Sequence, residues 1–245
     1  MKLTSHATIL DFEPYRLRTE TTPTHNLGEF VNMADGRRFR YGKVGAVAVT
    51  KGKLQTAPAA KANHHNLVVL TAAATGSLIV TVTLGATAAV ANEYAEGYLV
   101  INDNAGEGQV YQISSHPAAA SSATLALTLF DPIQVALTGT SDGTLVPNNY
   151  SGFIEGTSAT IKPAGVPLLD LGIGNFGWVQ TGGIAGVLAG GTIGVGGWCV
   201  ADGSVAGAVA LASATIATTV VQNRVGYAVV AGVSTEYRPV FLTID

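Results

Sequence analysis

Hydrophobic and polar residues alternate along several short stretches of the chain. Residues 77–84 and 124–130 show this alternation most clearly, and both stretches are rich in Leu and Thr. A period of two is typical of a β-strand with one buried face. Clusters of glycine, proline, asparagine and aspartate separate the stretches at short intervals. Because such residues form turns, the pattern predicts an all-β protein made of small β-barrel or sandwich domains.

The pattern also divides the chain into four regions. Residues 1–36 show little periodicity, and we expect an extended N-terminal arm that becomes ordered by docking onto something else. Residues 37–63 are predicted to form a β-hairpin and a linker that join the C-terminal domain. Residues 64–140 are an inserted small β domain, with a weak helix candidate at 87–96. Residues 141–245 are predicted to form a C-terminal β-barrel-like domain.

The composition indicates a surface with few charges. Charged residues make up 12% of the chain, about half the roughly 25% that is typical of soluble domains. Glycine occurs 30 times, against about 17 expected at average usage. Much of the surface must therefore be small, apolar or uncharged. Proteins whose surface is covered by neighbouring subunits often have this composition, because interface cores are depleted in charge.

Charge is also unevenly distributed along the chain. Residues 1–61 contain ten basic and five acidic residues, a net charge of +5, whereas residues 62–245 contain three basic and eleven acidic residues, a net charge of −8. The two values add up to the net charge of −3 of the whole chain. This asymmetry predicts a basic arm that contacts an acidic partner and an acidic body that faces outward.

Neither a signal peptide nor a membrane span is expected. Asp11 and Glu13 interrupt the N-terminal region before an apolar core can form. Residues 171–201 contain no charge and would be long enough to cross a bilayer. About a third of this stretch is glycine, however, which suits strands and turns better than a helix.

Two short motifs resemble those of enzymes. Residues 172–177 match GxGxxG, but no helix start follows to hold a pyrophosphate, so tight β turns are the preferred interpretation. Residues 139–143 match GxSxG, but no helix follows them, and the last histidine, His116, precedes the serine. We therefore expect no catalytic residue and no enzymatic activity.

Candidate metal ligands are equally weak. His64 and His65 are adjacent and would point to opposite faces of a strand, so we interpret them as linker histidines. Residues 102–107 contain Asn, Asp and Glu but lack the alternating ligands of a calcium loop, so a hairpin loop is preferred over a weak ion site. The single Cys199 is interpreted as a small core residue. No metal or cofactor is expected.

Basic and aromatic residues are interleaved over residues 37–43. Three interpretations are open: a solvated strand edge, an electrostatic contact with a partner protein, and binding of nucleic acid. Nucleic acid is the least favoured of the three because the cluster is short and the rest of the protein is acidic.

Several glycine- and aromatic-rich segments resemble capsid decoration (cement) proteins of tailed bacteriophages. These segments are residues 176–183, 196–205, 225–228 and 237–244, together with residues 36–45, which resemble the lead-in to the β body of such virion proteins. The resemblance covers about half of the chain in two separated blocks, and residues 64–140 would be an insertion.

The resemblance implies a non-enzymatic β protein on the outer capsid surface, in a virion assembled after synthesis in the host cytoplasm. Such proteins are often trimers, and they clamp neighbouring subunits of the major capsid protein. The implied partners are thus the major capsid protein and further copies of this chain, without nucleic acid or membrane. The basic residues expected to contact the capsid are Arg16, Arg18, Arg37, Arg38, Arg40 and Lys43.

Two other functions remain as alternatives. One is a different virion structural component, such as a head fibre or a tail protein. The other is a carbohydrate-binding module or an enzyme on a β-barrel. The second alternative is less favoured, because aromatic residues make up only 7% of the chain and no pair of carboxylates stands out.

Overall fold

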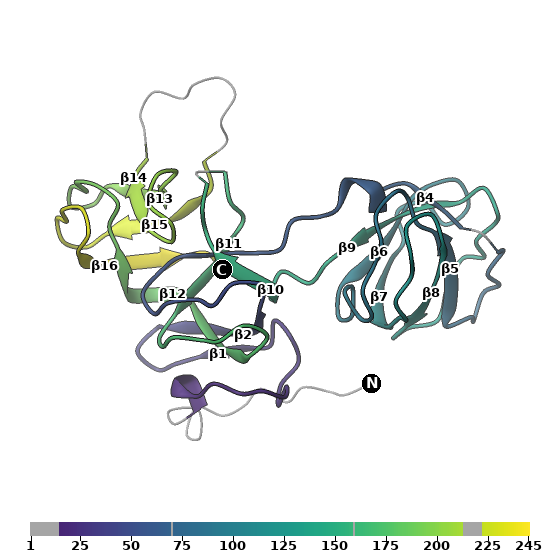
Figure 1. Ribbon diagram of the computed structural model, residues 1–245, viewed down its shortest axis with the longest axis horizontal. Coiled ribbons are helices and arrows are strands. Elements are labelled where there is room, and N and C mark those ends of the chain that lie inside the picture. Colours follow the sequence, from purple (N-terminus) through teal and green to yellow (C-terminus); the bar gives the residue numbers. More distant parts are fainter. Residues whose placement is uncertain (1–14, 70, 159, 213–221) are drawn as a thin grey trace. The chain divides into compact units, whose positions relative to one another are not determined.

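The computed structural model describes residues 15–69, 71–158, 160–212 and 222–245 (Figure 1). The described residues are almost entirely strands, bridges and turns, which confirms the predicted all-β class. The chain separates into two compact units. One, the inserted module, is Ala59–Asn148, and the other, the body, comprises the described residues before and after it.

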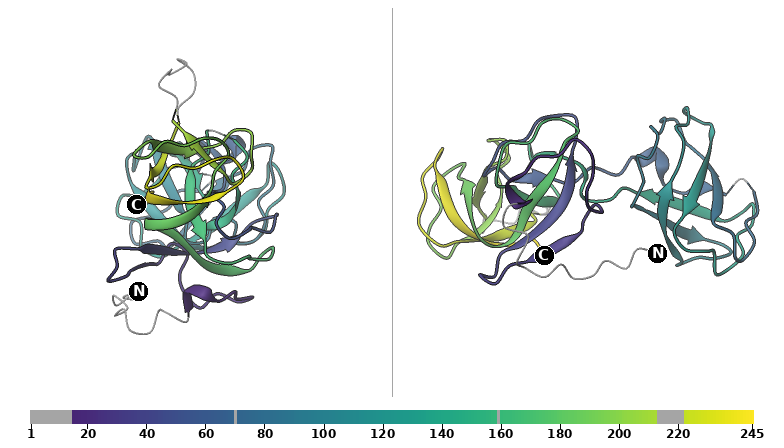
Figure 2. Two further views of the ribbon diagram at one scale, coloured as in Figure 1. Left: turned by 90° about the vertical axis from the view of Figure 1, so that its left-hand side faces the viewer. Right: turned by 90° about the horizontal axis from the view of Figure 1, so that it is seen from below.

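The inserted module is a six-stranded sheet that is nearly closed into a barrel (Figure 2). An isolated bridge between Val69 and Val82 brings its two edges together. A short 3₁₀ turn, η3 (Ala62–His64), precedes the strands. In sheet order the strands are β4 (Leu67–Val68), β9 (Asp142–Val146), β6 (Tyr98–Asp103), β7 (Val110–Ser115), β8 (Thr124–Leu129) and β5 (Ile79–Thr83).

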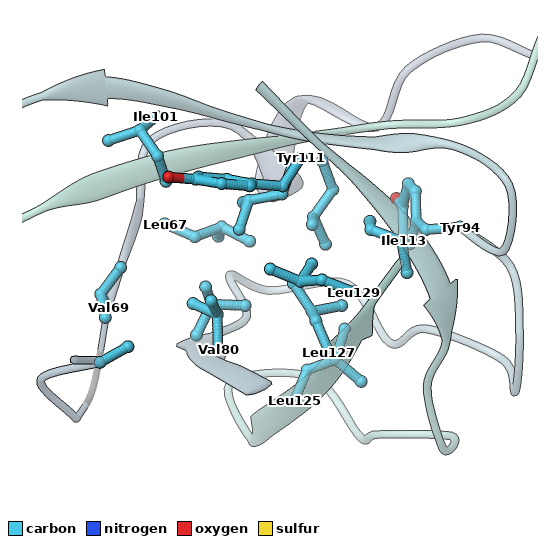
Figure 3. Packing of buried hydrophobic residues seen from close by; sticks show 14 of the residues in the cluster. Leu67, Val69, Val80, Tyr94, Ile101, Tyr111, Ile113, Leu125, Leu127 and Leu129 are labelled. Carbon is cyan, nitrogen blue, oxygen red and sulfur yellow. The ribbon is translucent and has the colours of Figure 1, made fainter. Parts of the chain in front are cut away.

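Strand β8 shows how alternation builds the core of the module. Leu125, Leu127 and Leu129 are buried, and the threonines and alanine between them are exposed. Figure 3 shows the three leucines on one side of the strand, facing Val80 and Tyr111. Burying each such leucine contributes about 1.5–3 kcal/mol.

The module is longer than predicted at its C-terminal end. Strand β9 pairs with β6, and Leu145 lies opposite Leu99 in its core. The predicted boundary at residue 140 is therefore wrong, because a turn-rich segment contained a buried strand. Residues 87–96 form a bridge at Ala89 followed by turns, not a helix.

The body contains a ten-stranded sheet. In chain order its strands are β1 (Phe30–Asn32), β2 (Arg38–Val44), β3 (Gln55–Thr56), β10 (Ser151–Glu155), β11 (Pro163–Pro167), β12 (Phe176–Leu188), β13 (Trp198–Ala201), β14 (Val209–Leu211), β15 (Arg224–Ala228) and β16 (Tyr237–Thr243). The order in the sheet is β1-β2-β10-β3-β11-β12-β16-β15-β13-β14.

Two barrels share the long strand β12. Pairing of β12 with β2 closes the first barrel, β2-β10-β3-β11-β12. In the second barrel, β12-β16-β15-β13-β14, a parallel bridge between Ala189 and Val209 returns β14 to the end of β12. The predicted hairpin over residues 37–63 is wrong: β2 pairs with β1, β10 and β12, whereas β3 pairs with β10 and β11.

The burial of β12 changes halfway along the strand. Every residue from Phe176 to Gly183 is buried. From Ile184 to Val187 exposed and buried residues alternate, and Leu188 is buried. Odd-numbered residues enter the barrel interiors, Val179 in the first and Val187 in the second. The even-numbered face is therefore covered along the first barrel and open along part of the second. Residues 171–201 thus contain strands, as their glycine content indicated.

A bridge followed by a turn recurs in the body. Leu171 pairs with Val49, and Ile193 pairs with Gly232, each through two backbone hydrogen bonds. Residues 172–175 form such a turn, in which the N–H of Asn175 donates to the carbonyl of Gly172 and Gly174 has a φ of 73°. The GxGxxG motif is therefore a β turn that leads into β12.

The expectation of an arm that needs a partner to become ordered is wrong for residues 15–36, and residues 1–14 lie outside the described residues. A 3₁₀ turn, η2 (Tyr15–Leu17), is followed by a backbone bridge from Glu20 to Phe176. Strand β1 pairs with β2 in antiparallel register. The bridge joins positions far apart in sequence and β1 has only three residues, so local periodicity did not predict these contacts.

Candidate interaction surface

No group of three or more His, Cys, Asp or Glu side chains in the described part of the chain is arranged to hold a metal ion. His64 is not a linker residue but a buried part of the module core. Its Nδ1 lies 2.5 Å from the hydroxyl of Tyr94, and its Nε2 lies 2.8 Å from the carbonyl of Thr87. His65, by contrast, is exposed. The sequence carried no signal for this buried pair beyond the presence of a histidine and a tyrosine.

Ser141 and Cys199 are also structural. The hydroxyl of Ser141 is buried and donates to the carbonyl of Ala105 at 2.8 Å. The motif around Ser141 leads into strand β9 rather than a helix. Burial raises the pKa of the Cys199 thiol to about 11, so the thiol is protonated and unreactive at neutral pH.

Three of the six predicted capsid-contact residues bind groups of the chain itself. Arg40 Nε lies 2.7 Å from the Asp245 carboxylate, and Arg38 Nη1 donates to the Asp245 carbonyl at 2.9 Å. Arg37 pairs with Asp35 at 2.6 Å. The N–H of Arg37 donates to the Asp35 carboxylate and thereby lowers its pKa.

The other three basic residues lie around the same strands. Arg16 Nη1 is 4.0 Å from the sulfur of Met33, and Arg18 is exposed. The ammonium of Lys43 lies 5.7 Å from the centroid of the Phe176 ring. The structure brings Arg38 and Arg40 together on Asp245, so these two guanidinium groups stabilise the body itself.

A cluster of aromatic side chains, the covered row, occupies the even-numbered face of β12 in the first barrel. It consists of Tyr41, Phe176 and Trp178, which are 0%, 8% and 3% exposed. Trp178 lies opposite Tyr41 in the strand register, and the two rings make an edge-on contact at 5.2 Å. Val31 and Met33 belong to the same hydrophobic cluster.

The segment that covers this row, residues 20–29, carries two carboxylates, Glu20 and Glu29. Its backbone pairs Glu20 with Phe176, and Glu29 accepts a hydrogen bond from the N–H of Tyr41. The Glu20 carboxylate accepts a hydrogen bond from the Tyr41 hydroxyl. His25 packs edge-on against both Tyr41 and Trp178 at 5.1 Å. An acidic segment of the chain thus covers the aromatic side of the first barrel.

A second line of side chains, the exposed row, crosses the second barrel. Trp198, Tyr227, Phe241 and Ile184 lie opposite one another in the register of β13, β15, β16 and β12. Figure 1 labels these four strands in the body. Trp198 is 42% exposed and Ile184 is 47% exposed. Tyr227 and Phe241 stack at 5.1 Å with an interplanar angle of 12°. The guanidinium of Arg224 lies 4.5 Å from the centroid of the Trp198 ring.

The outer wall of the inserted module is also free of charge where β5 meets β8. Its outward residues are Ile79, Thr81, Thr83, Thr124, Ala126 and Thr128. The acidic residues of the module lie mainly in loops and strand ends, and Lys61 is its only basic residue. Such uncharged strand faces are typical of surfaces that a neighbour covers.

Among the described residues, no helix is both long enough and apolar enough to cross a bilayer. No protein-family model, curated protein or solved structure matches this chain. The fold therefore defines the class, an all-β protein of barrel-like sheets, and the function is argued from its surfaces.

Proposed function

We propose that this chain is a virion structural protein that binds the outer surface of a phage capsid and clamps neighbouring major capsid subunits. The observation that carries the proposal is the location of its exposed apolar side chains. Trp198 and Ile184 are exposed in the exposed row of the body, and Ile79 is exposed on the uncharged β5–β8 wall of the module. Faces of this kind become stable when another protein covers them.

The distribution of charge agrees with this role. Residues 59–148 contain one basic and six acidic residues, a net charge of −5, which leaves +2 for the rest of the chain given the total of −3. We propose that the body contacts the capsid and that the acidic loops and strand ends of the module face solvent. The proposal does not require an extended basic arm, because residues 15–36 are bound to the body.

A clamp stabilises a shell through binding linkage. A protein that binds only the assembled, expanded shell adds its binding free energy to the stability of that shell. We propose that the chain acts as a homotrimer, since three copies around one axis would multiply the contacts with neighbouring subunits.

The test mixes the purified protein with expanded capsids that lack it. We expect stoichiometric binding at near-physiological salt and a higher temperature of capsid disruption. Absence of binding, or location of the chain in a fibre or the tail of a virion reconstruction, would overturn the proposal. Mass photometry tests the trimer separately, and a stable monomer at micromolar concentration would contradict it.

A further inference from the structure

We propose that the exposed row, with Arg224 at its end, is the docking surface for an extended acidic segment of the major capsid protein. This inference rests on the proposed function and identifies the surface through which the body binds. The burial of β12 differs between the two barrels. On its even-numbered face, Phe176 and Trp178 belong to the covered row of the first barrel, whereas Ile184 is the end of the exposed row of the second.

The covered row shows which kind of segment fits such a face. Residues of the chain itself lie over it, and backbone pairing holds them to the barrel strands at Glu20 and along β1. The Glu20 carboxylate accepts a hydrogen bond from the Tyr41 hydroxyl, which is the polar group of the row. The exposed row has the same elements, namely aromatic rings next to a polar group that can bind a carboxylate.

Arg224 indicates the charge of the missing segment. Its side chain is exposed and lies over Trp198, and within the described residues no carboxylate pairs with it. A guanidinium group binds a carboxylate through two parallel hydrogen bonds. Trp, Tyr and Arg are also the residues that most often dominate binding energy at protein interfaces.

Two other occupants fit the row less well. A sugar stacks on open ring faces, but Tyr227 and Phe241 cover each other and Arg224 covers Trp198. A second copy in a two-fold dimer would bring this face against itself, and the row contains no carboxylate that could pair with Arg224. An acidic segment of a different protein satisfies both the charge and the apolar row.

The experiment measures binding of full-length variants to expanded, undecorated capsids. Arg224→Glu reverses the charge on the row, and Trp198→Ala removes the ring beneath it. We expect each to weaken binding at least about tenfold, in line with the loss of a charge pair or an aromatic anchor. Arg224→Lys should bind with intermediate affinity, because it retains the charge and loses the planar geometry.

The matched control is Lys162→Glu, an exposed position of the body that makes the same change in charge. It should bind like the wild type. If the wild type binds capsids and Arg224→Glu and Trp198→Ala bind equally well, the inference is wrong and the proposed function stands. If the wild type does not bind, both fail. If Arg224→Glu alters the oligomeric state instead of capsid affinity, the row is a subunit interface and the inference is overturned.

Discussion

Arg40 and Asp245 form an ion pair at 2.7 Å although 205 residues separate them in the sequence. The pair joins β2 to the segment that follows β16, and Arg38 adds a hydrogen bond to the carbonyl of Asp245. Both side chains of the pair are partly exposed, at 29% and 24%. Solvent therefore screens the attraction, and its contribution to stability is modest.

We expect Asp245→Ala to lower the free energy of unfolding of the body by about 0.5–1 kcal/mol at low salt. The loss should shrink at high salt, because ions screen the pair that the wild type retains. Urea unfolding at two ionic strengths measures both effects. Asp131→Ala, an exposed position in the module, is the control. An equal effect of the two substitutions would contradict a specific role for the pair.

The stability of the body should also decrease at alkaline pH. Burial raises the pKa of Tyr41 to about 12, and its hydrogen bond to Glu20 acts in the same direction. Burial likewise raises the pKa of Tyr150 to about 12. Between about pH 10 and about pH 12 the folded state keeps protons that the unfolded chain releases, so the free energy of unfolding falls as pH rises through this window.

Below about pH 10 both states hold the tyrosine protons, and this contribution does not change with pH. Urea unfolding of the wild type and of Tyr41→Phe between about pH 9 and about pH 12 tests the assignment. The variant should show a shallower decline, because phenylalanine has no proton to lose. Tyr237→Phe, at a position that is 51% exposed, is the control and should follow the wild type.

Local patterns predicted the strands better than the contacts between them. The alternation over residues 77–84 and 124–130 corresponds to β5 and β8, because each strand buries one face in a single core. The order of residues 15–36 left no period in the sequence, because a single bridge to the distant Phe176 holds Glu20 and β1 is a strand of only three residues. The six basic residues expected to contact the capsid were identified by their charge. The fold determines which groups they bind, such as Asp245 for Arg38 and Arg40.

The exposed row illustrates the same limit. Trp198, Tyr227 and Phe241 lie in three glycine- and aromatic-rich segments, residues 196–205, 225–228 and 237–244. Their side chains form one line because of the register of β13, β15 and β16. This register includes an irregularity between Cys199 and Val200. A one-residue shift of a strand would move its side chain to the other face of the sheet. Composition therefore predicts an interface, and the strand register forms the exposed row that we propose for it.

The recurring turn predicts a stabilising substitution at Thr235. The turns at 172–175, 194–197 and 233–236 place their third residue at positive φ, 73° for Gly174, 73° for Gly196 and 70° for Thr235. A β-branched residue is strained in this region, at a cost of about 1–2 kcal/mol. Thr235→Gly should therefore raise the stability of the body by about 0.5–1 kcal/mol, after the entropy of glycine in the unfolded chain is subtracted.

The reciprocal change provides the control. Gly196→Thr should destabilise the body by about 1–2 kcal/mol, since open space surrounds this glycine and only its φ resists a side chain. Thermal unfolding of both variants measures the two shifts. Shifts of the same sign would show that the turns do not share one conformation in solution.

A second glycine pair tests the packing of β15 on β16. A Cβ atom added at Gly226 would lie 2.0 Å from the backbone oxygen of Phe241, which is far inside contact distance. A Cβ added at Gly186 in β12 would meet nothing within 4 Å. We expect Gly226→Ala to destabilise the body by about 1–3 kcal/mol or more, because the strands must separate. Gly186→Ala should change stability by less than about 0.5 kcal/mol. Comparable losses in chemical denaturation would contradict this difference in packing.

The inserted module and the body should unfold as separate units, because their cores do not share residues. The largest cluster lies wholly within residues 67–145, and the other three clusters consist of body residues.

Leu127→Ala leaves a cavity in the module core, where the leucine is 0% exposed, and should cost about 2–5 kcal/mol. Calorimetry should show one transition shifted to lower temperature and the other unchanged. The matched substitution Leu242→Ala in β16, where the leucine is 1% exposed, should shift the other transition instead. A single transition that moves with both substitutions would mean that the two units unfold cooperatively.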